Sequence, residues 1–319
     1  FKKLLIKFPF FEVLIRNLYW RVEVFNKLIK FLNKKGKKSL DENKVSYQNT
    51  DVFFSQFWSQ NINSEELVVL HSSLSNLGKS GIDKNRFTHL LIEKTKIQRL
   101  TIVAPTFPLF RNELKGLKRF GSPSLDPKKF IFDCGSKRIS TGLFGKELIK
   151  DKDSIRSKIP INNLSAIGPL AEKLFEKENE YYKSPYPCGI YSPWQKLYEL
   201  NALIIFFDVN PAHTCTIIHY LEDSNPDIWP IKNWYRERNF MIQINKKFET
   251  FRTFERHPKW SMSYCENIFL RDLIANKIIK NRNICGIDIS TCYARNFIEF
   301  LKNKNKNKKF YPYFMPFLS

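Results

Sequence analysis

The feature that most constrains this chain is a regular alternation of short apolar runs with longer amphipathic stretches. The runs have the length and side-chain content of strands and lie at 67–71, 101–105, 202–209, 239–244 and 284–289. Stretches with helical periodicity lie at 84–95, 141–150, 168–178, 192–200, 214–222, 262–280 and 290–303. Such alternation is typical of layered α/β proteins. The sequence therefore predicts an α/β fold: a mixed, layered sheet flanked by helices, preceded by an N-terminal helical extension.

The N-terminal extension is predicted as a unit of its own, because apolar and basic residues alternate over 1–33. Charges recur too often there for a membrane-spanning helix, and the segment lacks the uninterrupted apolar run of a secretory signal. Two interpretations remain: an amphipathic helix on a membrane surface, or a helix that packs on the main body, which we slightly favour. The polar segment 33–39 has the composition of a linker. We therefore assign 1–38 to a basic amphipathic extension and 39–319 to the main α/β domain.

The formal net charge of +22, from 53 basic and 31 acidic residues, is compatible with nucleic-acid binding. However, lysines occur along the whole chain and no nucleic-acid-binding motif is present, so we expect no specific nucleic-acid partner. The positive charge is better suited to attracting small substrates that carry phosphate. The six cysteines are scattered without metal-ligand spacing, which predicts reduced thiols in a cytoplasmic protein and no metal site.

One motif with residues suited to catalysis is the segment 214–222, TCTIIHYLE, which follows a strand-like run and an Asn-Pro turn. A helix that opens at Thr214 or Thr216 places Thr216, His219 and Glu222 on one face. A histidine oriented by a carboxylate is suited to act as a general base. Taken alone, the pattern is better explained by a threonine N-cap followed by a histidine at the edge of the core.

A second motif, HSSLSNLG at 71–78, directly follows the apolar run 67–70. Its serines favour a turn or the start of a helix. Free backbone N–H groups and hydroxyls after a strand form a natural cradle for a phosphate or pyrophosphate. Serine-rich turns of this kind are common, and most are only structural. The second motif alone is therefore a weak indication of a binding site, and it counts mainly in combination with the first. A pocket shared by His219 and the turn 72–75 would distinguish an enzyme from a binding module.

Together the two motifs resemble the aminoglycoside 3-N-acetyltransferase family, which carries both in this order. Further landmarks of that family follow in sequence at 101–107 (TIVAPTF), 140–148 (STGLFGKEL), 156–157 (RS), 165–172 (SAIGPLAE) and 192–200 (SPWQKLYEL). The resemblance covers roughly residues 64 to 300. It implies an acetyl-CoA-dependent N-acetyltransferase in the cytoplasm with a small-molecule amine as acceptor. Any peripheral membrane contact would be made by the N-terminal segment.

The resemblance also implies residue roles. His219 would be the general base, Glu222 would orient it, and Thr216 would position a reacting group. The residues implied in binding coenzyme A are His71, Ser72, Ser73, Leu74, Ser75, Thr106 and Arg156. Those implied in binding the acceptor are Asp208, His213 and Glu255.

Structural alternatives stay open for several of these residues. Thr106 also fits a residue that closes a turn, and Arg156 fits one partner of a surface salt bridge. For Glu255, an ion pair with Arg256 or another neighbour is the safer interpretation. Cys215 is better explained as a small buried residue than as a nucleophile.

Three departures from the family pattern bear on the acceptor. Ile159 stands where many relatives have histidine, Asp208 stands where many have glycine, and His213 follows an added residue. Together with the charge of +22, which disfavours a polycationic antibiotic, they favour an amino sugar, nucleotide-linked and used for surface polysaccharide. The alternative within this chemistry is an aminoglycoside, and hence antibiotic resistance. The alternative of another class is a non-catalytic basic protein that binds nucleic acid or an anionic membrane.

Overall fold

The computed structural model describes residues 2–22, 25, 27, 49–62, 64–110, 130–229, 231–244, 246–306 and 310–315. Its centre is a seven-stranded sheet in the order β4-β5-β2-β1-β6-β10-β9. The strands are β1 (Leu67–Ser72), β2 (Thr101–Pro105), β4 (Ile155–Arg156), β5 (Leu164–Ile167), β6 (Leu203–Phe207), β9 (Lys280–Ile284) and β10 (Ile287–Tyr293). The three central strands β2, β1 and β6 are parallel, and the outer strands pair antiparallel. The sheet is therefore mixed, as the sequence predicts.

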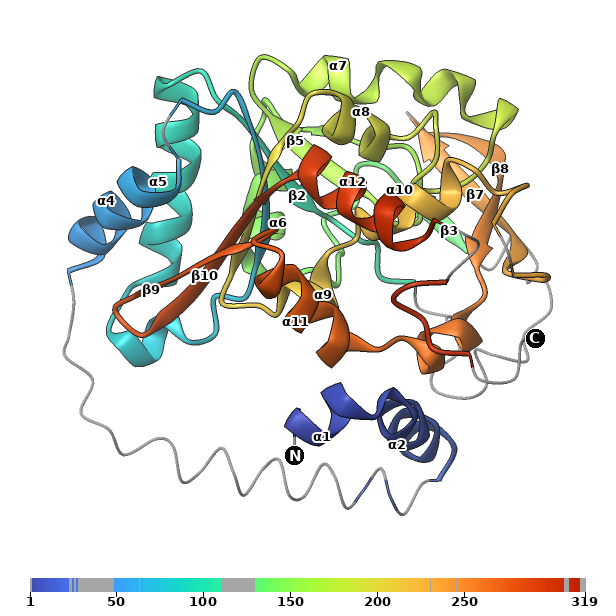
Figure 1. Cartoon of the computed structure of the whole chain (residues 1–319). Helices are drawn as coiled ribbons and strands as arrows, with labels where there is room; N and C mark the ends of the chain where they lie inside the picture. Colours follow the sequence, from blue (N-terminus) through green and yellow to red (C-terminus); the bar gives the residue numbers. More distant parts are fainter. Residues whose placement is uncertain are drawn as a thin grey trace.

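Helices cover both faces of this sheet, so the body has three layers (Figure 1). Side chains of β1 alternate between two apolar cores: Val68 and Leu70 lie in one, Leu67 and Val69 in the other. The first core is closed by α4 (Thr50–Asn61), α5 (Lys84–Ile97) and α6 (Gly142–Lys150). The second is closed by α7 (Ala171–Phe175), α8 (Pro193–Glu199), α9 (Pro211–Thr214), α10 (Ile218–Asp223), α11 (Glu266–Ala275) and α12 (Ala294–Lys304). The predicted α/β class and layered arrangement are confirmed.

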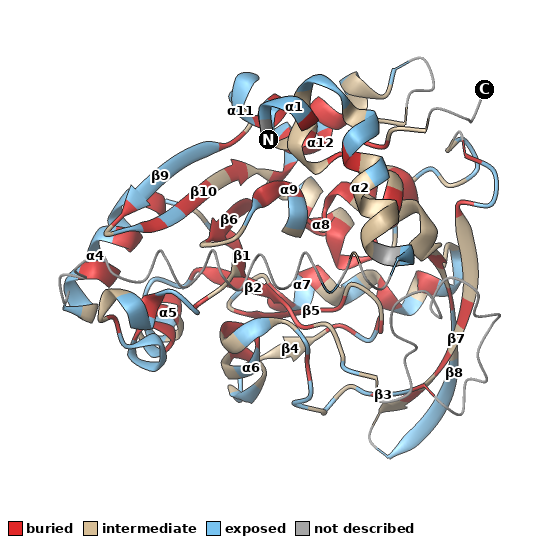
Figure 2. Cartoon of the chain, turned by 90° about the horizontal axis from the view of Figure 1, so that it is seen from below, coloured by how far each residue is buried: buried red, intermediate tan, exposed pale blue. Residues whose placement is uncertain are grey.

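A second, three-stranded sheet lies beside the main body. It contains β3 (Ile131–Asp133) and a long antiparallel hairpin of β7 (Tyr235–Ile244) and β8 (Lys247–Arg256). Short 3₁₀ helices are η1 (Leu77–Ser80), η4 (Glu176–Lys183) and η5 (Pro258–Ser263). The central strands of the main sheet are buried, whereas much of β8 and β9 is exposed (Figure 2).

The expected strand at 284–289 is wrong, because the chain turns back within it. Cys285 and Gly286 have φ angles of 53° and 81°, and Ile284 pairs with Ile287 across this two-residue turn. Positive φ at both central residues is the conformation that joins tightly paired antiparallel strands. The segment 284–289 therefore contains the end of β9, the turn and the start of β10.

The N-terminal unit, α1 (Lys2–Lys7) and α2 (Pro9–Arg21), lies against α11 and η5 (Figure 1). The buried carboxylate of Glu12 accepts hydrogen bonds from the backbone N–H groups of Glu266 (2.8 Å) and Asn267 (3.2 Å), at the start of α11. Arg16 forms an ion pair with Glu266 at 2.7 Å. The described helices thus pack on the body, and the expected linker 33–39 lies outside the described residues. No helix within the described ranges is long and apolar enough to cross a membrane.

Candidate active site

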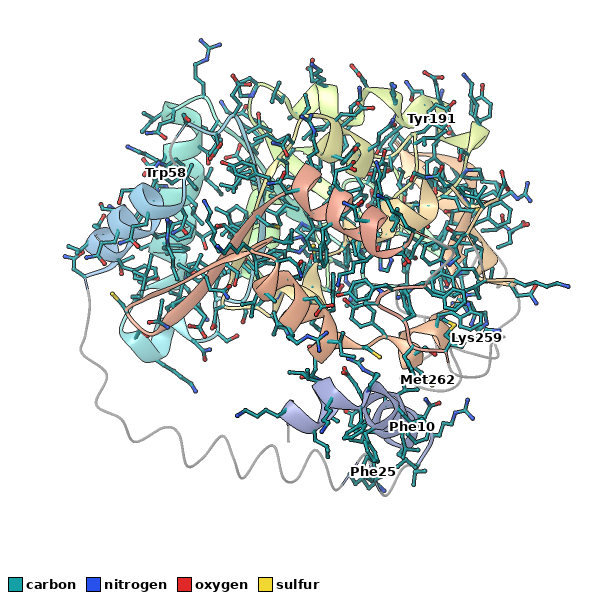
Figure 3. The ribbon with its side chains drawn as sticks, viewed as in Figure 1. Phe10, Phe25, Trp58, Tyr191, Lys259 and Met262 are labelled. Atoms are coloured by element: carbon teal, nitrogen blue, oxygen red, sulfur yellow. The ribbon has the colours of Figure 1, made fainter. Side chains whose placement is uncertain are left out.

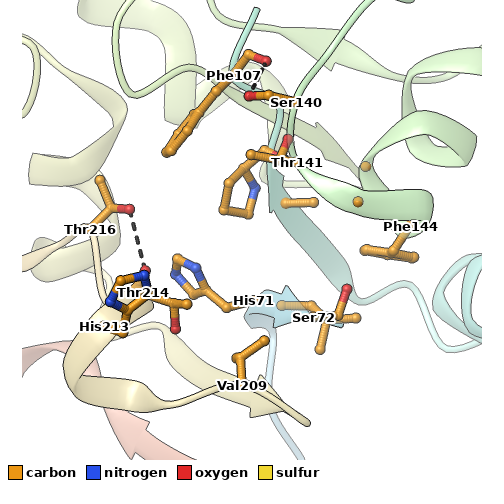
Figure 4. Close-up of a pocket in the computed structure, with 15 residues that line it drawn as sticks. His71, Ser72, Phe107, Ser140, Thr141, Phe144, Val209, His213, Thr214 and Thr216 are labelled. Atoms are coloured by element: carbon orange, nitrogen blue, oxygen red, sulfur yellow. Dashed lines mark hydrogen bonds between the residues drawn. The ribbon is translucent and has the colours of Figure 1, made fainter. Parts of the chain in front are cut away.

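A pocket of about 380 Å³ opens beyond the carboxyl ends of the three parallel strands (Figure 4). Its walls come from within four segments, at 70–72, 104–107, 140–145 and 209–216. In the sheet, β2 lies on one side of β1 and β6 lies on the other. The direction in which strands are added to the sheet therefore reverses next to the pocket. In open α/β sheets, ligands bind at this position.

His71, at the end of β1, supplies a polar group to this pocket. The side chain is 5% exposed, and its ring stacks on Phe206 with centroids 5.4 Å apart. Burial lowers the pKa of His71 to about 4, so the imidazole is neutral near pH 7. Its Nε2 atom is buried and has no hydrogen-bond partner among the described residues. Because buried polar atoms are nearly always paired, this atom is suited to a ligand group.

The start of α6 forms the facing wall, and two glycines allow its close approach. Gly142 has a φ of 68°, and a Cβ added to Gly145 would lie 2.9 Å from the Pro105 carbonyl oxygen. Thr141 donates its hydroxyl to that same carbonyl at 2.6 Å and accepts no hydrogen bond from the helix N-terminus. The first N–H groups of α6 therefore remain for other partners. In the sequence, residues 140–148 stand out only as a family landmark, and their contribution to the wall of a pocket is not predicted.

The serine-rich turn after β1 contributes less to the pocket than expected. Of the residues 71–75, only His71 and Ser72 line it. The Ser73 N–H is not free, because it donates to the Phe207 carbonyl at 2.9 Å. The hydroxyls of Ser73 and Ser75 bond to each other at 2.7 Å, and Leu74 is buried in the core. The phosphate cradle predicted for this turn stays a prediction.

Thr106 and Arg156 occupy structural positions rather than the pocket lining. The buried hydroxyl of Thr106 lies 2.8 Å from Asn163 Oδ1 and 2.9 Å from Ser165 Oγ. Arg156 donates to Asn163 Oδ1 (2.8 Å), to the Thr106 carbonyl (2.9 Å) and to the Ser136 carbonyl. Burial lowers the pKa of Arg156 to about 10. The geometry therefore favours a structural role for both residues, although Arg156 takes it through hydrogen bonds to uncharged oxygens and not through the surface salt bridge expected as its alternative.

The expected helix over 214–222 is broken, yet it keeps the spacing of its polar residues. Helix α9 ends at Thr214, Cys215 leaves helical geometry with a ψ of 88°, and α10 begins at Ile218. Thr216 lies in the intervening turn and lines the pocket. The His219 backbone N–H donates to the Thr216 carbonyl at 3.1 Å, so His219 lies one turn beyond the lining residues. Its side chain is partly accessible, at 21% exposure.

Glu222 holds the ring of His219, with 3.2 Å between Nδ1 and Oε2. This carboxylate is 1% exposed and also accepts hydrogen bonds from Trp234 Nε1 (3.2 Å) and the Tyr313 hydroxyl (2.8 Å). Burial acts to raise the pKa of Glu222, but His219, Arg256 and Tyr313 together hold it below its ordinary value. An ionised carboxylate only accepts hydrogen bonds, so Nδ1 of His219 donates to it, and in the neutral form of the ring Nε2 is then the acceptor.

The next residue, Asp223, has the opposite protonation state. It accepts hydrogen bonds from the Cys188 backbone N–H (2.9 Å) and the Tyr235 hydroxyl (3.0 Å). Burial, with the adjacent charge of Glu222, raises the pKa of Asp223 to about 8. Two consecutive buried carboxyl groups are thus one ionised and one protonated near pH 7. Separated pKa values of this kind are typical of functional sites.

Sequence reasoning missed the groups that hold Glu222. The local sequence pattern gives neither Trp234 nor Tyr313 a role in the site. Tyr313 reaches Glu222 because the segment 310–315 folds back on the body, where the Cys265 N–H donates to the Pro312 carbonyl at 3.0 Å. No local signal indicates this contact, since Tyr313 and Glu222 are 91 positions apart.

His213 lies at the rim of the pocket, with its side chain 68% exposed. Its Nδ1 lies 3.1 Å from Glu266 Oε2, and this hydrogen bond raises the pKa of His213 above its ordinary value. Glu266 also accepts from Asn210 Nδ2 at 2.6 Å and pairs with Arg16 of α2. The N-terminal unit is therefore connected to the pocket rim.

The other two residues expected on the acceptor side do not line the pocket. Asp208, with a φ of 53°, accepts a hydrogen bond from Asn76 Nδ2 at 2.8 Å and so links the segment after β6 to the turn after β1. Glu255 lies in β8 of the second sheet and forms ion pairs with Arg236 and, at 2.9 Å, with Arg238. The geometry of Glu255 favours the ion-pair alternative. Within the described segments, no cluster of His, Cys, Asp or Glu is arranged to hold a metal ion.

Comparisons with known proteins agree with this architecture. The YokD protein from Bacillus subtilis is 16% identical, covers 83% of this chain and 97% of its own, and superposes with a TM-score of 0.59. The aminoglycoside acetyltransferase AAC(3)-IVa apoenzyme is 16% identical, with 83% of this chain and 90% of its own covered and a TM-score of 0.57. AAC-IIIb in its binary complex with CoASH is 15% identical, with coverages of 81% and 98% and a TM-score of 0.57.

At the level of sequence, no curated protein matches the chain. The family model of aminoglycoside 3-N-acetyltransferases matches residues 69–304, which is most of the chain and contains the pocket and His219. The chain therefore belongs to the aminoglycoside 3-N-acetyltransferase family, and it is an N-acetyltransferase with acetyl-CoA as its cosubstrate.

Proposed function

We propose that this enzyme acetylates an amine of an aminoglycoside-type acceptor, with His219 as the general base. The observation that carries the proposal is the hydrogen bond between His219 and the buried Glu222, one turn from a pocket at the carboxyl ends of β1, β2 and β6. N-acetyl transfer needs a neutral amine, a cosubstrate held in reach and a group that accepts the proton of the amine. The site offers a candidate for each requirement.

The pocket suits the polar, elongated coenzyme A. Its unpaired His71 Nε2, the hydroxyl of Ser72 and the N–H groups at the start of α6 are complementary to amide and phosphate groups. The glycines at 142 and 145 keep that wall free of side chains. Acetyl-CoA supplies the acetyl group as an activated thioester. We therefore assign its binding to His71, Ser72 and the segment 140–145.

His219 is oriented to accept a proton at Nε2. Glu222 fixes the Nδ1–H tautomer and stabilises the imidazolium that forms when the ammonium of the acceptor loses its proton. Thr216, which lines the pocket and adjoins His219 through its carbonyl, positions a reacting group. Trp234 and Tyr313 keep the carboxylate in place.

For the acceptor, the comparisons favour the aminoglycoside over the amino sugar that the sequence departures favour. The family is described by its action on aminoglycosides, and structures of AAC(3)-IVa and AAC-VIa contain gentamicin and sisomicin, respectively. A nucleotide-linked amino sugar is the second candidate. It is favoured by the net charge of +22 and by His213 at the pocket rim, whose raised pKa increases its positive charge.

A thiol-release assay with acetyl-CoA tests the proposal on a panel of aminoglycosides, free amino sugars and nucleotide-linked amino sugars. We expect turnover that falls roughly 10²- to 10⁴-fold in the His219→Ala variant, the usual contribution of a positioned general base. His89→Ala is the matched control, because His89 is an exposed histidine paired with Glu93 on α5. Equal losses in both variants would contradict the role of His219. A higher kcat/KM for nucleotide-linked sugars would select the second candidate.

A further inference from the structure

Helix α2 of the N-terminal unit buries a charged side chain, Glu12, whereas its apolar side chains Phe10 and Phe11 are exposed. Helix α2 contacts the body through charged groups: Glu12 caps α11 and Arg16 pairs with Glu266. On a helix of 3.6 residues per turn, Phe10 and Leu14 are neighbours, and Phe11 lies on the same side, away from Glu12 and Arg16. A helix held only by apolar packing would show the reverse arrangement. The outward side of α2 therefore has a use other than packing on this domain.

Six large apolar side chains of α1, α2 and their flanking residues are exposed. Their exposed fractions range from 39% to 45%, and they are Leu4, Phe8, Phe10, Phe11, Leu14 and Val22. The Phe8 and Phe10 rings lie 6.0 and 6.1 Å, respectively, from the Phe11 ring, centroid to centroid. Figure 3 labels Phe10 on the N-terminal unit, at the lower edge of the molecule. We refer to the six side chains as the aromatic patch.

Three exposed cations lie on the same two helices as the aromatic patch. Lys3, Lys7 and Arg21 are exposed, and Lys7 Nζ lies 5.5 Å from the centre of the Phe8 ring. Aromatic and aliphatic groups flanked by lysine and arginine are the composition of helices that lie in the interface of a membrane. The apolar groups enter the boundary of the acyl chains, and the cations bind anionic headgroups.

We propose that the α1–α2 unit docks this enzyme on an anionic membrane surface through the aromatic patch and these three cations. With 13 residues, α2 is too short to span a bilayer, so it lies on the surface. A second copy of the chain is a less suitable occupant, because it would bring a charge of +22 against +22. An anionic membrane surface can bury the apolar side chains of the unit and bind its cations at the same time.

Co-sedimentation of the full chain with lipid vesicles tests the proposal. We expect binding to vesicles of phosphatidylcholine mixed with phosphatidylglycerol, and much weaker binding to phosphatidylcholine alone. The double variant Phe10→Ser with Phe11→Ser should lose about tenfold or more in partition coefficient. Lys7→Gln and Arg21→Gln should each lose about fivefold at low salt, the usual contribution of one cation near an anionic surface.

Ile97→Ser is the matched control, because Ile97 is a 74% exposed apolar residue on α5. It should bind vesicles like the unchanged protein, and thermal denaturation should show that all variants are folded. Vesicle binding that is equal in the phenylalanine variant and the Ile97 control would overturn the proposal. It would also be overturned by variants that change the oligomeric state, measured by light scattering, while leaving vesicle binding unchanged.

Discussion

Replacing Glu222 with glutamine tests whether the charge of this buried carboxylate supports His219. Glutamine has nearly the same shape, and its amide oxygen can still accept the Nδ1–H of His219. The replacement therefore removes the charge while leaving a partner for the ring. We expect a lower kcat for acetyl transfer with a small change in the KM for acetyl-CoA, because Glu222 does not line the pocket.

The size of the effect follows from the separation of the two groups. At the 3.2 Å between Nδ1 and Oε2, two unit charges attract by about 5 kcal/mol at an effective dielectric constant of about 20. If about half of the charge has developed on His219 in the transition state, the loss is about 2–3 kcal/mol. Since about 1.4 kcal/mol corresponds to a tenfold change in rate, kcat should fall roughly 30- to 150-fold.

Asp223→Asn is the matched control for this experiment. Asp223 is adjacent and equally buried, but its raised pKa of about 8 keeps it protonated near pH 7, so asparagine replaces a neutral group. Initial rates of thiol release at pH 7 should thus be close to those of the unchanged enzyme. The reasoning would be refuted if Glu222→Gln retained full kcat, or if Asp223→Asn lost as much activity as Glu222→Gln while both remained folded.

Three further outcomes are expected. His71→Leu should raise the KM for acetyl-CoA about threefold to tenfold with little change in kcat, because one neutral hydrogen bond in the pocket is lost; steady-state kinetics measure this. Gly168→Ala should lower the free energy of unfolding by about 3 kcal/mol or more, since its φ is 123° and the new Cβ would lie 2.2 Å from the Leu100 carbonyl oxygen. In urea denaturation, Gly78→Ala, with open space around it, should stay near the unchanged protein. Because the pKa of Asp223 is raised to about 8, its ionisation opposes folding, so stability is lost as pH rises from about 4 through about 8. The thermal midpoint of Asp223→Asn should exceed that of the unchanged protein increasingly over this range.

Local pattern was sufficient to predict the layered α/β class and the three central strands. The apolar runs at 67–71, 101–105 and 202–209 became β1, β2 and β6, because strands buried on both faces are apolar along their whole length. The sequence pattern does not predict strand β8, because its first six residues are mostly exposed and mix charged with aromatic side chains. The backbone hydrogen bonds to β7, rather than its own composition, hold β8 in the strand conformation.

The sequence by itself determined the spacing of the polar residues in the candidate site. Thr216, His219 and Glu222 lie at intervals of three, which brings them together in any helical turn, even though α9 and α10 are separate. Only the tertiary structure decided that Glu222 is ionised and Asp223 protonated. Those states depend on burial and on donors such as Trp234 and Tyr313, which are 12 and 91 positions from Glu222 and reach it only when the chain is folded. Solvent exclusion and long-range hydrogen bonds set pKa values, and neither is a property of a local segment.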